Sequence, residues 1–122
     1  MLEPGTLLTE LAHCIGTEHY YSHWSKQLVY TDGVKTLAEG GECYWLIDAI
    51  ASHQSFLNRD HPQLCDLQTW LLTVYPTRMA TLICTLNDSK AAVRQEILFT
   101  DFPLPDFKLY CFDSVLLLPS EN

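Results

Sequence analysis

LQTWLLTVYPTRMATLICTL, residues 67–86, is the part of this 122-residue sequence that decides the fold. Residues 67–75 are rich in strand-forming side chains, and Ala80, Leu82 and Cys84 occupy alternate positions in 79–86, as they do in a strand with one buried face. Pro76-Thr77-Arg78 separates the two runs with the chemistry of a turn. This stretch therefore predicts two neighbouring antiparallel strands.

Further strands are expected beyond residue 90. Alternation over 93–99 predicts one of them, and 107–112 and 115–118 predict a closing hairpin around Asp113-Ser114. Because the connections are short, we expect the strands to follow one another in an antiparallel meander of four to five strands.

The sequence before residue 62 shows helical spacing instead. It predicts helices over 6–15 (Thr6 as N-cap), 18–24, 34–39 and 42 to about 57. Helices followed by strands are typical of an α+β fold. We expect a single α+β domain over 1–122, in which the helices of an N-terminal half (about 5–60) pack on one face of a C-terminal antiparallel sheet (about 65–119).

The chain is acidic, with a formal net charge of -8. Acids outnumber Lys and Arg by eight to three in residues 1–62 and by seven to four in 63–122, so the charge is not confined to a tail. Nucleic-acid binding relies on Lys and Arg that neutralise phosphates, so we expect no direct contact with nucleic acid. An acidic surface can instead meet a basic partner protein, or simply keep the protein soluble.

No run approaches the ~18 apolar residues of a membrane helix, and the N-terminus lacks a basic region followed by an apolar run. We therefore expect no membrane contact and a cytoplasmic location. The cysteines are odd in number and include no Cys-x-x-Cys, which argues against a zinc ribbon and a disulfide framework. We expect all five to be structural thiols: Cys14, Cys43, Cys65, Cys84 and Cys111.

His19 and His23 lie four residues apart, which on a helix places both rings on one face, the spacing of a two-histidine metal site. No Glu follows His19, and a third ligand would have to come from Asp32, His53 or another distant residue. Two surface histidines are the commoner explanation. We expect no metal and no cofactor.

Asp48 stands in an otherwise apolar helix, where a carboxylate is costly unless it is hydrogen-bonded or paired. It could pair with His53, with Ser52 or Tyr44 in reach, or cap the backbone of the turn at 30–33. We interpret Asp48 and His53 as structural polar residues. The alternative is an enzyme with a site assembled from His19, His23, Asp32, Asp48 and His53.

The aromatic residues are unevenly distributed. All five Phe lie at or after Phe56, whereas six of the nine Tyr and Trp lie between Tyr20 and Trp45. Tyr and Trp suit half-wet positions and are enriched at partner-binding surfaces. An amphipathic layer between helices and sheet is the alternative interpretation. The candidate partner-binding residues are His19, Tyr20, Tyr21, His23, Trp24, Tyr30 and Asp32.

Five segments carry a resemblance to a known family: GTEHYY (16–21), YTDGVK (30–35) with LAE (37–39), YWLIDAI (44–50) with SHQ (52–54), FTDFPL (99–104) and LLLPSE (116–121). Together they resemble an uncharacterised family of small proteins, a domain of unknown function found in cyanobacteria and other bacteria and on plasmids and phages. The resemblance covers about residues 16–121. It implies a mobile-element setting and supplies no catalytic residue.

The leading hypothesis is a small, acidic, non-enzymatic module that binds a protein partner. The mobile-element setting extends it to an inhibitor of a host nucleic-acid-binding defence complex, of the anti-CRISPR or antirestriction kind. Besides the enzyme, a homodimer whose aromatic surface is its own interface is the other alternative.

Overall fold

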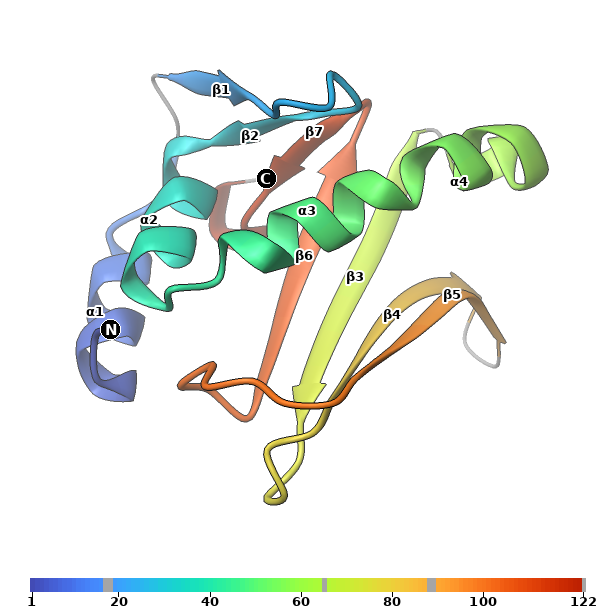
Figure 1. Cartoon of the computed structure of the whole chain (residues 1–122). Helices are drawn as coiled ribbons and strands as arrows, with labels where there is room; N and C mark the ends of the chain where they lie inside the picture. Colours follow the sequence, from blue (N-terminus) through green and yellow to red (C-terminus); the bar gives the residue numbers. More distant parts are fainter. Residues whose placement is uncertain (17–18, 65, 88–89, 122) are drawn as a thin grey trace.

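The computed structural model describes residues 1–16, 19–64, 66–87 and 90–121 (Figure 1). Its helices are α1 (Pro4–Ala12), α2 (Asp32–Gly40), α3 (Tyr44–Ser52) and α4 (Gln54–Asp60), and single 3-10 turns span Pro62–Leu64 and Pro119–Glu121. Its strands are β1 (Tyr20–Ser22), β2 (Val29–Thr31), β3 (Leu67–Val74), β4 (Ala80–Asn87), β5 (Lys90–Ile97), β6 (Asp106–Phe112) and β7 (Val115–Leu117). The predicted α+β class is confirmed.

Within the described residues the strands form one seven-stranded sheet in the order β1-β2-β7-β6-β3-β4-β5. The sheet is larger than the predicted four to five strands, and it is not a simple meander. β6 pairs with β3 instead of β5, so β6-β3-β4-β5 follow the order of a Greek key. The connection over 98–105 carries the chain from β5 back across the sheet to β6 (Figure 1).

The predicted helix over 18–24 is wrong. Tyr20–Ser22 forms β1, which pairs antiparallel with β2, and Tyr21 lies opposite Tyr30. β2 in turn pairs in parallel with β7 from the other end of the chain. Tyrosine favours strands, and the pairing with β2 supplies backbone hydrogen bonds that a short isolated helix lacks. Thr17 and Glu18 lie outside the described residues.

The other helices form close to their predicted places. α1 begins at Pro4 after Glu3, earlier than the predicted Thr6. α2 begins earlier as well, because the Thr31 hydroxyl accepts a hydrogen bond from the backbone N–H of Val34 (3.2 Å) and so caps the helix. The predicted long helix over 42–57 is divided at His53 into α3 and α4, where the His53 N–H donates to Ile50 O, three residues back, in a tightened turn.

The helices α2, α3 and α4 lie over one face of the sheet (Figure 1). The core between the two layers includes Leu46 and Ile50 of α3 and Trp70 and Leu72 of β3, all buried. Burying one such aliphatic side chain contributes about 1.5–3 kcal/mol to folding. The core therefore holds α3 firmly across the middle strands.

Two buried amides fasten α4 to β3. Gln54 and Gln68 exchange hydrogen bonds of 2.9 Å, and the Trp70 indole N–H donates to the Gln68 carbonyl oxygen, also at 2.9 Å. Because buried polar groups are costly when unpaired, this closed set fixes the register between the helical layer and the sheet.

Candidate functional site

The predicted partner-binding residues divide into an exposed group and an internal group. The Trp24 side chain is 79% exposed and the Tyr20 side chain 60%, and His19 is exposed beside them. His23, in contrast, is buried, with 5% of its surface accessible. The structure therefore presents Trp24 and Tyr20 to solvent and uses His23 internally.

His23 joins the β1–β2 connection to α3. Its Nε2 lies 2.7 Å from Asp48 Oδ1, and its Nδ1 lies 2.7 Å from the Ser25 hydroxyl. The Trp24 indole N–H donates to the same Asp48 oxygen at 3.3 Å, and the Trp24 and His23 rings lie 5.1 Å apart. We call these four side chains, Trp24, His23, Ser25 and Asp48, the His23 clamp.

The hydrogen bonds of the clamp define the proton position on a neutral His23. The backbone N–H of Ser25 donates to Nδ1 (3.1 Å), so Nδ1 is an acceptor and the proton is on Nε2, which donates to Asp48. The clamp thus gives a buried imidazole a partner on each nitrogen, and it fixes the exposed Trp24 ring through the same carboxylate.

A second group surrounds Asp32. The Tyr21 hydroxyl donates to Asp32 Oδ1 at 3.0 Å, and this bond to a carboxylate raises the pKa of Tyr21. The ring of Tyr21 stacks on Tyr30, and the Lys35 ammonium lies 4.5 Å from its centre. The backbone N–H of His19 also donates to Asp32, at 3.1 Å. These side chains fasten β1 to β2 and to the first turn of α2.

Asp48 and His53 do not form the pair considered from the sequence. Asp48 contacts His23 instead, whereas His53 Nε2 lies 2.7 Å from Gln95 Oε1, and the His53 ring stacks on Trp70. Asp48 does not cap the turn at 30–33 either.

Glu121 makes that capping interaction, because its carboxylate accepts from the Thr31 hydroxyl (2.7 Å) and from the Gly33 N–H (3.3 Å). Nothing in the local spacing pointed to a residue so far along the chain.

The five residues of the alternative enzymatic site do not converge. His19 lies 3.6 Å from Asp32, His23 pairs with Asp48, and His53 pairs with Gln95. In the described part of the chain, no three His, Cys, Asp or Glu side chains are grouped so that they could hold a metal ion.

Ser25, His23 and Asp48 make a hydrogen-bonded chain of the residue types found in hydrolases. This series of hydrogen bonds is local, because Ser25 donates to the His23 ring, two residues before it, through both its hydroxyl and its backbone N–H. Among the described residues, four surface pockets are lined by other side chains than Ser25 and His23. A nucleophile needs a place for the reacting carbonyl within reach, so this geometry supports a structural clamp.

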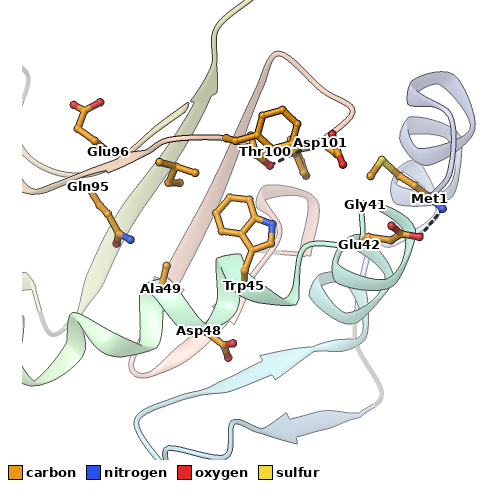
Figure 2. A pocket seen from close by; sticks show the side chains of 13 residues that line it. Met1, Gly41, Glu42, Trp45, Asp48, Ala49, Gln95, Glu96, Thr100 and Asp101 are labelled. Atoms are coloured by element: carbon orange, nitrogen blue, oxygen red, sulfur yellow. Dashed lines mark hydrogen bonds and ion pairs between the residues drawn. The ribbon is translucent and has the colours of Figure 1, made fainter. Parts of the chain in front are cut away.

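A groove of about 680 Å³ opens between α3 and the end of β5 with the connection that follows it (Figure 2). We call it the α3 groove. The Trp45 side chain points into it from α3 (Figure 2). Its lining residues are Met1, Gly41, Glu42, Trp45, Asp48, Ala49, Gln95, Glu96, Ile97, Phe99, Thr100, Asp101 and Phe102.

The sequence reasoning did not predict this groove. Its walls nevertheless come from two of the segments that carried the family resemblance, 44–50 and 99–104, which face each other across it. Two others, 16–21 and 30–35, contribute to β1, β2 and the group around Asp32.

The described cysteines Cys14, Cys43, Cys84 and Cys111 are free thiols, and Cys65 lies outside the described residues. Burial raises the pKa of Cys43, Cys84 and Cys111 to about 12. Because the thiolate is the reactive form, these three are unsuited to nucleophilic chemistry.

The chain belongs to a family of unknown function, DUF6876, which it matches over residues 5–122. No curated protein and no solved structure matches it. Within the residues that the structure describes, no helix is of a length and apolar character that would let it cross a membrane.

Proposed function

We propose that this protein is a non-enzymatic module that binds a basic partner protein through the β1–β2 connection and the adjoining part of α3 that carries Asp48. The observation that carries the proposal is Trp24. Its indole is 79% exposed, and yet its N–H is already fixed by Asp48 in the His23 clamp.

The exposed Trp24 ring leaves a large apolar surface in water, and a partner that covers it gains the free energy of burying that surface. Tryptophan is also enriched among the residues that contribute most to protein–protein affinity. Holding the ring in place before binding avoids about 0.5–1.5 kcal/mol of side-chain ordering. Trp24 therefore has the properties of a preorganised anchor for a partner.

The charge indicates the chemistry of that partner. The chain carries a net charge of -8, and Asp48, which holds Trp24, also lines the α3 groove with Glu42 and Asp101. A partner that extends from Trp24 across α3 to the groove therefore meets further carboxylates. Complementary charge raises the association rate and the specificity for a basic surface.

The family resemblance gives this proposal a finer form. On a plasmid or phage, an acidic module of this kind would occupy the basic groove in which a host defence complex holds nucleic acid. The protein would then act as an inhibitor of the anti-CRISPR or antirestriction kind. This mechanism requires no catalysis, because occupying the nucleic-acid groove of the host complex is sufficient.

Affinity capture tests the proposal. The tagged protein is passed through a nuclease-treated lysate of its host, and bound proteins are identified by mass spectrometry. We expect one stoichiometric basic partner that elutes with salt and that nucleic acid displaces in a competition assay. A partner that is acidic, or that binds this protein and nucleic acid simultaneously, would contradict the proposal.

A further inference from the structure

The α3 groove has a wall that is fixed before any ligand arrives. The Arg78 guanidinium donates to the carbonyl oxygens of Thr100 (3.1 Å) and Phe102 (2.9 Å), and the Thr100 N–H donates back to Arg78 O (2.9 Å). The Phe102 N–H donates to the Thr100 hydroxyl at 3.1 Å. These bonds hold the segment that carries Phe99 and Asp101 on the rim of the groove.

Aromatic side chains line the groove and remain available to a ligand. Trp45 is half-buried and points into it (Figure 2), and Phe99 is 65% exposed at its edge. The Trp45 indole N–H makes no hydrogen bond to another described residue, although it is a donor that usually finds a partner when it is shielded from water. A bound segment can supply an acceptor from its own backbone.

The groove carries an excess of negative charge. Four of its lining residues are acidic, and none of the lining residues among those described is Lys or Arg. The Met1 ammonium also lines the groove, and it is paired with Glu42 at 2.8 Å. Glu96 is occupied by Arg94 (3.0 Å), and Asp48 by the His23 clamp, whereas Asp101 makes no hydrogen bond or ion pair with another described residue. Asp101 is therefore the carboxylate that remains for a cation from outside.

We propose that the α3 groove receives an arginine side chain from the basic partner, with the guanidinium lying on Trp45 and paired with Asp101. This inference rests on the proposed function and names the chemical group that the partner brings. A planar guanidinium suits both contacts, because it stacks on aromatic faces and also pairs with a carboxylate through two N–H groups. Lysine offers a point charge without the plane. An anionic ligand would be repelled by the excess of carboxylates, because the Met1 ammonium is already paired with Glu42.

A defined peptide tests the inference without the partner. The probe is a fluorescein-labelled hexapeptide of alternating glycine and arginine, and its control replaces each arginine by citrulline, which keeps the shape and removes the charge. Fluorescence anisotropy is measured with the wild type, with Asp101→Asn and with Asp106→Asn. Asp106→Asn is the matched control, since Asp106 is also an exposed aspartate, on β6 and outside the groove.

We expect the arginine peptide to bind the wild type and the citrulline peptide to fail. Asp101→Asn should weaken binding about five- to tenfold, because it removes one charge-assisted contact. Asp106→Asn should change binding less than about twofold. Absence of binding, equal binding of the citrulline peptide, or equal effects of the two variants would overturn the inference.

Nuclear magnetic resonance locates the peptide independently. The indole N–H resonance of Trp45 should shift during titration, while that of the buried Trp70 should stay in place. An unmoved Trp45 resonance would also overturn the inference. These experiments do not use Trp24, so they separate the inference from the proposed function. If the peptide fails to bind but affinity capture still recovers a basic partner, the inference is wrong and the proposed function stands. If the peptide binds but no basic partner is captured, the proposed function is wrong.

Discussion

Asp48 illustrates how one carboxylate on α3 serves two purposes. It accepts from the buried His23 ring and from the exposed Trp24 ring through the same oxygen. The first contact satisfies a polar group that folding has removed from water, and the second fixes the side chain that we assign to partner binding. Stability and binding are therefore coupled at this residue, and variants can separate them.

Replacing Asp48 should lower the stability of the fold. Asp48→Ala leaves the buried Nε2–H of His23 without its acceptor, and we expect a loss of about 1–2 kcal/mol in the free energy of unfolding. Asp48→Asn keeps an acceptor oxygen and should lose less than half as much. Urea denaturation measures both values. Equal stability of the alanine variant and the wild type would show that the His23 clamp is energetically unimportant.

The buried thiols should resist modification in the folded state. Their raised pKa of about 12 leaves Cys43, Cys84 and Cys111 almost fully protonated at pH 9, where an unfolded cysteine is partly thiolate. Alkylation with iodoacetamide at pH 9, mapped by mass spectrometry, should label them only after denaturation. Labelling at similar rates in the folded and unfolded states would contradict the assigned burial.

The same pKa shifts predict how stability responds to alkali. Between pH 9 and about 12 the folded state keeps thiol protons that the unfolded state has lost, so the free energy of unfolding falls as the pH rises through this range. The part of the free energy of unfolding that depends on these thiol protons is fully present below pH 9.

Single residues could be recognised from the sequence more easily than their partners. Asp48 stands out in the sequence, because a carboxylate in an apolar helix requires an explanation. The sequence does not show that its partner is His23, because His23 lies in another element and reaches Asp48 only when the β1–β2 connection folds over α3. Spacing along one helix carries no information about such a contact.

At the level of elements, the turn between α2 and α3 has an unusual backbone. Glu42 has a φ of 50°, the left-handed region that favours glycine, and it also lines the α3 groove. A residue with a side chain is less stable in this conformation, by about 1–2 kcal/mol. The Glu42 carboxylate accepts a hydrogen bond from the Met1 ammonium at 2.8 Å, an exposed ion pair that offsets only a small part of this cost.

Replacing Glu42 by glycine should therefore stabilise the protein. We expect Glu42→Gly to raise the free energy of unfolding by up to about 1 kcal/mol, after allowance for the greater freedom of glycine in the unfolded chain. Glu39→Gly, inside α2, is the matched control and should lower it by about 1 kcal/mol. Thermal denaturation compares the two. A destabilised Glu42→Gly variant would show that the carboxylate contributes more to stability than the backbone strain removes.

Elements that depend on local contacts could be predicted from the sequence, whereas elements that depend on distant contacts could not. The helices α1–α3 and the strands β3–β7 could be anticipated, because local periodicity and turn residues mark them. β1 could not, because it depends on β2, and β2 on β7 at the far end of the chain. The Greek-key placement of β6 likewise depends on pairing with β3, which short connections alone do not reveal.

For the whole molecule, the arrangement of layers creates the candidate surface. α3 lies across the sheet with the His23 clamp on one side and the α3 groove on the other, and Asp48 belongs to both. The fold class and the acidic balance could be predicted from the sequence. The groove could not, because it joins residues 42–49 to residues 95–102, and only the tertiary fold brings them together.

The central claim is that Trp24 anchors a basic partner protein. The most direct measurement is quantitative affinity capture from nuclease-treated host lysate with the wild type, Trp24→Ala and Phe112→Ala. Phe112 is the matched control, because it is an exposed aromatic residue on β6 that lies in neither the clamp nor the α3 groove.

Far-ultraviolet circular dichroism first shows that the variants are folded. The account predicts that the wild type and Phe112→Ala capture a basic partner. Trp24→Ala should capture at least about tenfold less of it, because removing a binding anchor of about 1.4 kcal/mol or more lowers the affinity by that factor. Equal capture by the wild type and Trp24→Ala would contradict the claim. So would recovery of only a second copy of this chain, which would identify the aromatic surface as the interface of a homodimer.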